Sequence, residues 1–485
     1  MSKEKDLSPK SFGEIEKLFN QKLEEKLDAK FFQHFNGKID DIIFAVNRNN
    51  DNLQLQMRNS PAPKTVDGKY KVMFLIHNIS SFANVIEPLI KEAQTRPELD
   101  VIVASIPHCF PGELDILTEA EREKTPEGIE EDVHLYLNQK GIEHIRLNDK
   151  NSRDSLWTLK IINPAIIFKQ SQWDADVPFG FNAYNLSWTR LCILPYSGVL
   201  ITDVPGPDPE NPALGGVDDQ LYTRECWKFF TPNKYVKMEL KNTPLQGKNC
   251  VETGHPILET IQNAKPFWPN NEKNIGKSKL KVILSLHHSL TDDWFNFGVF
   301  HYAYKQILKL IKDTPDVEYL LSMHPTLVSH LMAGHNKDIS SAEFKTWLSD
   351  FENLPNTIIQ NGEAYESLFQ ASDVLLTDGI SWLAQYQIAG KEKGKPILYL
   401  ERPDHCPFNR CGEVAIQGVQ RIGCSKDNVE QAFENIKNEL LDLSQGEISA
   451  SIQKELQKQP KIVQDVFGKP GSAQRIVDEL VKVAI

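Results

Sequence analysis

The chain has 485 residues, of which 40% are hydrophobic and 25% are charged, and its formal net charge is −12. This length exceeds what one hydrophobic core organises, so we expect two or three domains. The acidic balance argues against a nucleic-acid partner, because phosphate backbones bind to basic surfaces. The sequence contains no run of about 18 apolar residues, which a membrane-spanning helix needs, and its first residues lack the apolar stretch of a signal peptide.

The seven cysteines are scattered along the chain. The only close pair, Cys406 and Cys411, has the wrong spacing for a zinc knuckle, and no second pair exists to complete one. No cluster of Asp, Glu or His has coordinating spacing, so we expect no protein-bound metal. We interpret the chain as a reduced, cytoplasmic protein without a resident cofactor.

Apolar residues recur at helical spacing between Phe12 and Phe35, at positions 12, 15, 19, 23, 27 and 31. This stripe predicts an amphipathic helix that packs on the protein or on a second subunit. Its polar faces carry Lys and Glu alike, so it is not the basic amphipathic helix that binds anionic lipid. A polar stretch rich in turn residues follows at 59–70, and we place an N-terminal helical extension and linker at residues 1–66.

Alternating strands and helices begin at Lys71. Short apolar runs separated by helices of about a dozen residues are typical of a parallel sheet that is covered on both faces. The expected strands lie at 71–78, 99–105, 142–147, 164–170, 190–201 and 225–233, with helices at 82–94 and 129–139. The segment 250–261 closes this series, so we place a first Rossmann-like domain, which would bind the acceptor, at residues 67–262.

A second alternating series begins near residue 279, after another linker-like stretch. The expected strands lie at 280–289, 317–325, 356–361, 373–378 and 395–400, and the expected helices at 295–312, 325–335, 364–372 and 381–389. The last 15 residues, 471–485, predict a helix that could cross back to the first domain. The second Rossmann-like domain, with this helix, takes residues 263–485. Two doubly wound domains in tandem predict a ligand cleft at the carboxyl ends of their strands.

The strongest signal for a ligand site follows the buried strand that ends near Leu376. A short turn leads directly into a helix that begins with small polar residues. This layout points free backbone N–H groups, a hydroxyl and the positive end of a helix at one place, which suits a phosphate. The predicted donor-binding residues of this turn are Thr377, Asp378, Gly379, Ile380 and Ser381. Asp378 could instead be the N-cap of the helix.

Three histidines follow strands of the same domain, and they are the candidate catalytic residues: His287, His288 and His324. Histidine can act as an acid or a base, or donate a hydrogen bond to a diphosphate. His324 could instead cap its strand by bonding a backbone carbonyl. His287 and His288 are adjacent, so in an extended chain they would face opposite sides and at most one would point into the cleft, with His288 preferred.

Other candidates lie at strand ends and in loops. Glu363 and Glu366 precede the phosphate turn and could bind a ribose diol. In the first domain, residues with polar side chains follow two strands and could contact the acceptor: His77, Asn78, Ser80, Trp173, Asp174 and Asp176. Either Asp174 or Asp176 could act as a base, although solvated loop acids are the simpler interpretation. A purely structural turn remains an alternative for His77 to Ser80.

These motifs, in their order, resemble the CDP-glycerol glycerophosphotransferase family, the teichoic-acid and capsule polymerase type, which has the GT-B fold. The similar segments are LCILPYSG with Tyr196, TGHPILE, MHP with His324 and Pro325, and SDVLLTDGISWLAQYQIAG. Two departures lie near the predicted phosphates. Ser197 stands where the family has Gly, and Gly379-Ile380 replace Tyr-Ser, while Ser381 is kept. The resemblance implies that Pro325 is a further donor-binding residue and that Tyr196 is a further acceptor-side residue.

The resemblance implies a transferase that moves glycerol phosphate, or a related polyol phosphate, from a CDP-activated donor to a hydroxyl of a surface polymer or glycan. CMP would leave, and His288 or His324 would take the acceptor proton. Such an enzyme could associate with the inner face of the cytoplasmic membrane or with a second copy of itself. The alternative enzyme is a GT-B glycosyltransferase that uses a UDP-, GDP- or CMP-sugar. A non-catalytic two-lobed protein that binds nucleotide or polymer is the third hypothesis.

Overall fold

The structure is a computed structural model that describes residues 51–109, 128–149, 151–196, 198–202, 219–273, 280–290, 295–359 and 365–482. The contacts divide the chain into two units, Met1–Ser60 and Pro61–Ile485. The helix predicted between Phe12 and Phe35 lies outside the described residues. Both predicted sheets belong to the larger unit.

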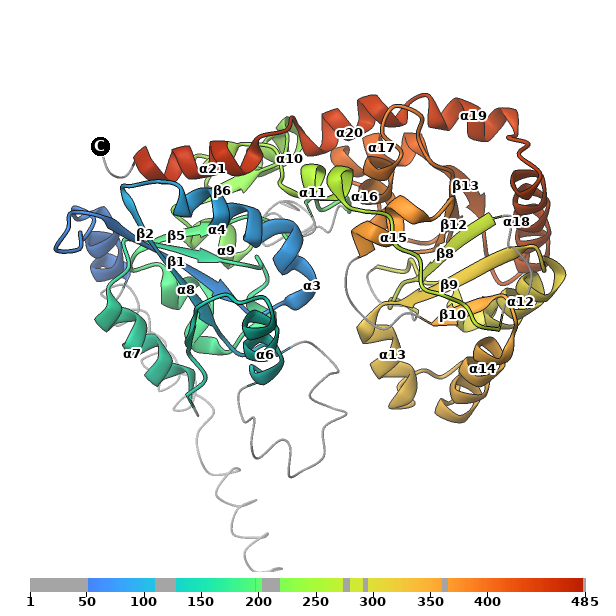
Figure 1. The fold of residues 1–485 in the computed structure, drawn as a ribbon, viewed down its shortest axis with the longest axis horizontal. Coiled ribbons are helices and arrows are strands. Elements are labelled where there is room, and N and C mark those ends of the chain that lie inside the picture. The colour runs from blue at the N-terminus through green and yellow to red at the C-terminus, as the bar shows by residue number, and fades with distance from the viewer. Residues whose placement is uncertain are drawn as a thin grey trace, which may run out of the picture. The chain divides into compact units, whose positions relative to one another are not determined.

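The first sheet has seven strands, and every pairing in it is parallel (Figure 1). Its spatial order is β3-β2-β1-β4-β5-β6-β7, which is the doubly wound arrangement that the alternating pattern predicts. The strands are β1 (Tyr70–Ile76), β2 (Leu99–Ser105), β3 (Ile145–Arg146), β4 (Ile166–Lys169), β5 (Arg190–Ile193), β6 (Lys228–Thr231) and β7 (Cys250–Glu252).

The second sheet has six parallel strands in the order β10-β9-β8-β11-β12-β13. It consists of β8 (Leu280–Leu286), β9 (Val317–Met323), β10 (Thr357–Ile359), β11 (Val374–Thr377), β12 (Ile397–Glu401) and β13 (Gln420–Gly423). We call the two sheets, each with the helices that cover it, the first lobe and the second lobe. The predicted α/β class with two Rossmann-like parallel sheets is therefore confirmed.

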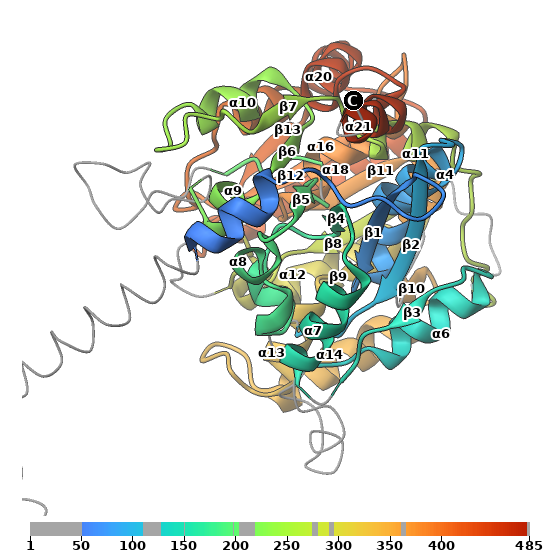
Figure 2. The ribbon, with the colours of Figure 1, turned by 90° about the vertical axis from the view of Figure 1, so that its left-hand side faces the viewer.

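Helices cover both faces of the first sheet. Apolar residues of α4 (Glu87–Gln94) and α6 (Glu131–Gln139) pack on one face, and those of α7 (Ser152–Ile162) and α8 (Ala183–Leu186) pack on the other. Figure 2 shows α4 and α8 on opposite sides of β1 and β4. The other described helices of this lobe are α3 (Ile79–Ser81), the π-helical turn η1 (Phe82–Ile86), the 3-10 turns η3 (Asp174–Asp176) and η4 (Phe179–Phe181), α9 (Leu221–Glu225) and α10 (Lys234–Leu240). The helix α11 (Ile257–Asn263) follows β7, but its buried residues belong to an apolar cluster of the second sheet.

The second sheet is covered in the same way. One face carries α12 (Phe300–Asp313), α14 (Ser341–Asn353), α18 (Val429–Ser444) and α19 (Ala450–Leu456), and the other carries α15 (Tyr365–Ala371), α16 (Ser381–Ala389), α17 (Arg410–Ala415) and α20 (Gln459–Phe467). The helix α13 (Pro325–Met332) follows β9. The sequence pattern places the start of α12 at residue 295, which is wrong, because side chains from other segments bind the backbone amides of Phe297, Gly298 and Val299.

The helix α21 (Ser472–Val481) returns to the first lobe, as predicted for the C-terminal residues (Figure 1). Its buried residues Ile476, Val477 and Leu480 belong to the same apolar cluster as Val72 and Phe74 of β1. Gly471 precedes the helix with φ +85°, a left-handed conformation that favours glycine. The C-terminal segment therefore covers the second sheet with α20 and the first with α21.

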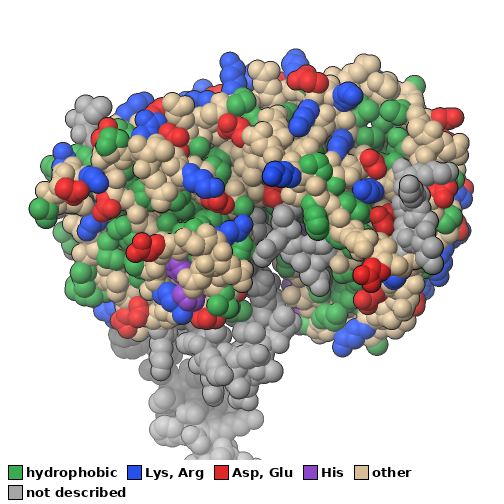
Figure 3. All heavy atoms as spheres, in the orientation of Figure 1, with side chains coloured by type: hydrophobic (Ala, Val, Ile, Leu, Met, Phe, Trp, Pro, Cys, Tyr) green, Lys and Arg blue, Asp and Glu red, His purple; other side chains and the backbone are tan. Residues whose placement is uncertain are grey.

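Within the described residues, no helix is long and apolar enough to cross a membrane. Figure 3 shows acidic and basic side chains mixed over the face in view, without an extended area of one sign. A strongly basic face, which nucleic-acid binding requires, is absent from the visible described surface.

Candidate functional site

The candidate catalytic residues of the second lobe and the predicted donor-binding residue Asp378 follow three neighbouring strands. His287 and His288 come directly after β8, His324 directly after β9, and Asp378 directly after β11. Since β8 lies between β9 and β11 and all three are parallel, their carboxyl ends share one edge of the sheet. The topology thus brings together residues that lie up to 91 positions apart.

The three imidazole rings contact one another. The ring centroids of His287 and His288 are 4.4 Å apart at an interplanar angle of 28°, and that of His324 lies 4.5 Å from His288 and 6.0 Å from His287. The expectation that His287 and His288 face opposite sides is therefore wrong. The alternation rule applies within a strand, but β8 ends at Leu286, and the two histidines lie in the turn beyond it.

His324 caps the helix that follows it rather than the strand before it. Its Nδ1 accepts a hydrogen bond from the backbone N–H of Thr326 at 3.2 Å, and it is the N-cap residue of α13. Pro325 occupies the first helical position, where the missing N–H costs nothing. Because Nδ1 is an acceptor, the proton of the neutral ring is on Nε2. Burial and the neighbouring His288 lower the pKa of His324 to about 3.

His287 has the same tautomer. Its Nδ1 accepts from the backbone N–H of Ser289 at 3.3 Å and lies 2.7 Å from the Ser289 hydroxyl oxygen. That oxygen accepts a hydrogen bond from Phe297 N at 3.0 Å, so the hydroxyl proton is free to point at Nδ1. Burial, followed by the positive charges that His288 and His324 could carry, lowers the pKa of His287 well below its ordinary value. Ser289 is a positioning residue that the sequence pattern does not reveal.

Asp378 is completely buried, and its carboxylate connects two backbone segments through hydrogen bonds. Oδ1 accepts from His287 N at 2.7 Å and Oδ2 accepts from Val299 N at 2.8 Å. The alternative role as N-cap of α16 is wrong, because the N-cap is Ile380 and no side chain caps that helix. Burial raises the pKa of Asp378 to about 7, although the two amide donors oppose this shift.

The predicted phosphate turn lies against His287. A Cβ added to Gly379 would lie 3.5 Å from Cβ and 3.6 Å from Cδ2 of His287, which is ordinary contact. The backbone N–H of Gly379 donates to Thr377 Oγ1 at 2.9 Å. The helix α16, whose first residue is Ser381, therefore begins next to the imidazoles with its first turn uncapped by any side chain. Such a helix end attracts an anion.

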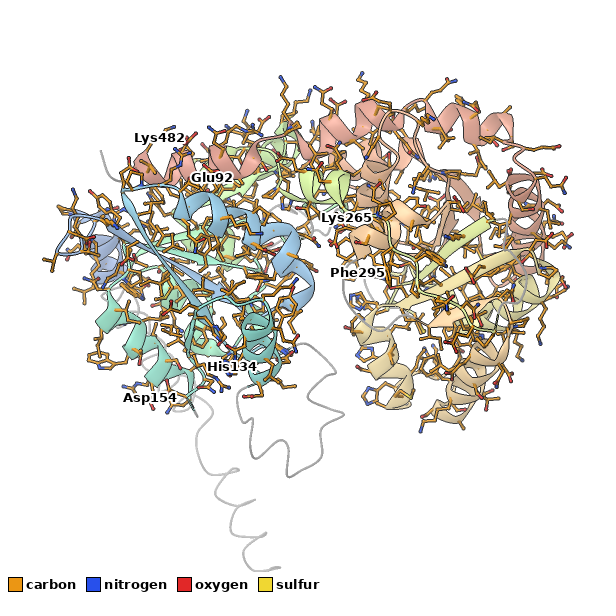
Figure 4. The ribbon with its side chains drawn as sticks, viewed as in Figure 1. Glu92, His134, Asp154, Lys265, Phe295 and Lys482 are labelled. Carbon is orange, nitrogen blue, oxygen red and sulfur yellow. The ribbon has the colours of Figure 1, made fainter. Side chains whose placement is uncertain are left out.

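Aromatic rings border the histidines. Phe295, labelled in Figure 4, has its ring centroid 6.3 Å from His287 and 6.2 Å from His288. Phe297 lies 5.8 Å from His287 and stacks at 4.9 Å on His405, which bonds Glu401 at the end of β12. The rings exclude water from one side of His287, consistent with the lowered pKa of this residue.

Glu366, the predicted ribose ligand, lies in the first turn of α15 and is buried. Burial raises its pKa, and a side-chain hydrogen bond with Asn84 of the first lobe lowers it in part. Glu363 and Ser197 lie outside the described residues. Ser80 lies in α3 and Ser381 opens α16, and the structure describes their backbone only.

In the first lobe, the predicted residues after β1 are held by a residue that we did not predict. Gln170, at the end of the neighbouring strand β4, accepts from the backbone N–H groups of His77 at 2.8 Å and Asn78 at 2.9 Å. The side chain of Asn78 accepts from Ser81 N and caps α3. His77 is fully buried, and burial, together with Lys169 and His108, lowers its pKa well below the ordinary value.

The loop after β4 contains the remaining candidates of this lobe. Asp174 Oδ1 lies 2.5 Å from Nζ of Lys169, a fully buried lysine of β4 that the sequence analysis did not single out. Asp176 accepts a hydrogen bond from the Ser171 hydroxyl at 3.0 Å, and burial raises its pKa to about 6. Trp173 makes a side-chain hydrogen bond with Tyr196, which follows β5, and burial raises the pKa of Tyr196 to about 12.

Among the described residues, no group of three or more His, Cys, Asp and Glu side chains could hold a metal ion. The seven cysteines are described, and all of them are free thiols. The second-lobe site therefore presents imidazoles, backbone amides and a helix end, which are groups that bind and polarise an anion.

No family model matches this chain, and no curated protein matches it. Among solved structures, it is similar to MnaA of S. aureus with UDP, at 16% identity and a TM-score of 0.54, over 85% of this chain and 96% of that one. A UDP-GlcNAc 2-epimerase from Neisseria meningitidis bound to UDP-GlcNAc matches at 16% identity and 0.51, over 85% of this chain and 100% of that one. The wall teichoic acid polymerase TagF matches over 93% of this chain and 97% of its own, at 13% identity and 0.48. The likeness establishes a GT-B-like fold.

Proposed function

We propose that the protein is a cytoplasmic transferase that moves glycerol phosphate, or a related polyol phosphate, from a CDP-activated donor to a hydroxyl of a polymer or glycan. The observation that supports this proposal most strongly is the meeting of three imidazoles with the uncapped start of α16. Solved proteins of the same fold include complexes with UDP and with UDP-GlcNAc, which is consistent with a nucleotide-activated donor.

The tautomers give His287 and His324 a defined role. In each ring Nδ1 accepts a backbone N–H, so each neutral ring offers Nε2–H as a donor. Protonation of Nδ1 in His324 would set that proton against the N–H of Thr326, which agrees with the low pKa of this residue. Both rings therefore act as neutral hydrogen-bond donors toward phosphate oxygens.

This role suits phosphoryl transfer. When the bond between the two donor phosphates breaks, negative charge grows on the departing CMP and on the transferred group. Fixed donors that point at this charge stabilise the transition state, and one such donor typically contributes about 10²–10³-fold in rate. The amides at the start of α16 act in the same sense, with the helix dipole adding to them.

The chemistry also needs a proton acceptor, because the acceptor hydroxyl becomes a phosphate ester. The fixed tautomers of His287 and His324 leave no unprotonated Nε2 for this task. Within the histidine cluster the candidate is then His288, while His324, which the sequence analysis considered as a base, becomes a donor. The scheme uses no metal or cofactor, and among the described residues no group of three or more His, Cys, Asp and Glu side chains could hold a metal ion.

A donor screen tests the proposal. Purified protein is incubated with CDP-glycerol or with UDP-, GDP- and CMP-sugars and a hydroxyl acceptor, and the products are identified by mass. The proposal expects CMP and an acceptor that has gained glycerol phosphate. Transfer of a sugar would favour the glycosyltransferase alternative, and tight nucleotide binding without turnover would favour the non-catalytic alternative.

A further inference from the structure

A second group of buried polar residues lies at the carboxyl edge of the first sheet. The ends of β1, β4 and β5 are neighbours there, and they bring together the buried residues His77, Lys169 and Gln172 with the half-buried Tyr196. Buried polar side chains are normally satisfied by partners within the protein. The loop after β4 contains two carboxylates, and their partners differ.

Asp174 is held by the fold through one of its two carboxylate oxygens. Its Oδ1 is 2.5 Å from Nζ of Lys169 and accepts a second hydrogen bond from Ala183 N at 2.8 Å. Lys169 is completely buried and needs this counter-charge, since an unpaired buried ammonium is strongly unfavourable. A carboxylate held in this way stabilises the loop and cannot take a proton from a substrate without leaving Lys169 unpaired.

Asp176 is different. Within the described part of the chain its carboxylate has one hydrogen-bond partner, the Ser171 hydroxyl at 3.0 Å, and the residue keeps part of its surface exposed. The charged or titratable groups around it are Lys169 of β4, His108 after β2, Asp174 of the same loop and Tyr196 after β5. Burial is the largest influence on its pKa and raises it to about 6. Such a carboxylate is mostly ionised at neutral pH and is a better base than an ordinary aspartate.

The neighbouring Gln172 has a buried hydrogen-bond donor without a partner in the described structure. Its side chain is completely buried, its Oε1 accepts from Tyr196 N at 3.4 Å, and its Nε2 has no hydrogen-bond partner in the described structure. The Gln172 carbonyl also accepts from Lys169 at 3.4 Å, so the same lysine contacts both Gln172 and Asp174. A buried amide donor without an acceptor indicates a place where a ligand or water oxygen belongs.

We propose that Asp176, rather than His288, is the general base of the transferase and that the carboxyl edge of the first sheet, with the Nε2–H of Gln172, binds the acceptor as a polyol hydroxyl. This inference rests on the proposed function. The hydroxyl oxygen forms a bond to the transferred phosphorus while its proton passes to the Asp176 carboxylate. The bond from that phosphorus to the CMP oxygen breaks, CMP leaves with the electron pair, and Asp176 releases the proton to solvent.

The test uses the full chain with CDP-glycerol as donor and glycerol as the acceptor probe. Asp176→Asn should lower kcat about 10²-fold or more while calorimetric CDP-glycerol affinity and the melting temperature stay near wild type. In wild type the rate should fall as the pH drops through about 6, and this acidic limb should disappear in Asp176→Asn. Asp176→Glu should restore part of the activity. Gln172→Leu should raise KM for glycerol more than it lowers kcat.

Asp174→Asn is the matched control, because it removes the partner of Lys169 and should lower the melting temperature. An Asp176→Asn enzyme with kcat within threefold of wild type, or with an unchanged acidic limb, overturns the assignment while the proposed function stands. Weakened CDP-glycerol binding in Asp176→Asn would also overturn it, because the residue would then belong to the donor side. A wild-type protein that transfers nothing from CDP-glycerol overturns both.

Discussion

The carboxylate of Asp378 accepts a hydrogen bond from the backbone N–H of His287 at 2.7 Å, so the end of β11 fixes the turn that carries the first two histidines. Its other oxygen binds Val299 N and fixes the start of α12. Asp378, which the sequence places in the predicted phosphate turn, therefore positions the backbone that carries the imidazole rings of His287 and His288.

Asp378→Asn should weaken both the fold and the reaction. The new amide group can accept only one of the two backbone donors and sets its own N–H against the other, which typically costs about 1–3 kcal/mol. The free energy of unfolding, measured with denaturant, and the turnover rate should both decrease. Asp373→Asn is the matched control: Asp373 lies at the opposite end of the same strand, is exposed, and accepts from Lys281 N at 2.8 Å. Equal turnover in wild type and Asp378→Asn would contradict the positioning role.

Replacements of Gly379 should separate stability from donor binding. A methyl group fits in ordinary contact with Thr377 and His287, so Gly379→Ala should fold with nearly wild-type stability. Calorimetry should nevertheless show weaker donor binding if phosphate lies over this backbone, and Gly379→Val should be worse than Gly379→Ala. Gly423→Ala, at the end of β13 with open space around its Cβ, should bind normally. Wild-type affinity in Gly379→Val would place the phosphate elsewhere.

The folded protein should lose stability as the pH falls below about 6.5, the ordinary pKa of histidine. Burial lowers the pKa of His255 to about 4 and of His324 to about 3, so in this range the unfolded chain binds protons that the folded chain does not. Asp378 contributes in the opposite sense, because its raised pKa of about 7 favours the folded state at lower pH. The melting temperature of His324→Asn relative to that of wild type isolates the contribution of His324. This relative value should increase as the pH drops. A pH-independent difference would contradict the assigned burial.

Turnover should survive a chelator. The described residues contain no cluster able to hold a metal ion, and the proposed stabilisation of charge uses imidazole and amide N–H groups. Assays with CDP-glycerol in EDTA should match those without it. Loss of activity in EDTA that returns with magnesium or manganese would show that a cation on the donor diphosphate is required.

The fold could be predicted because it depends on patterns within short segments. Strands such as Leu280–Leu286 are continuous apolar runs between helices, and this alternation is sufficient for two parallel sheets. The start of α12 could not be predicted in this way, since the amide of Val299 is bound by Asp378, 79 residues later. Helical periodicity carries no information on such a distant bond.

The candidate site was predictable in its location but not in its details. Strand ends and a turn before a helix indicated His287, His324 and the segment at Gly379. The tautomers depend on Ser289 and Thr326, whose backbone groups become partners only in the folded turns. In the first lobe, Lys169 forms an ion pair with Asp174. The signal for this pair in the sequence was a charged residue at the end of an apolar strand.

The kcat of His324→Asn tests most directly the central claim that imidazole Nε2–H groups act on the reacting phosphate. Asparagine is a strong N-cap residue and can replace the Nδ1 bond to Thr326, whereas it removes the Nε2–H. At neutral pH we expect an unchanged melting temperature and a kcat that falls by about 10²–10³-fold with little change in KM, measured beside His287→Ala, His288→Ala and His324→Ala. Near-normal kcat in both His324→Asn and His288→Ala, whatever their stability, would contradict it.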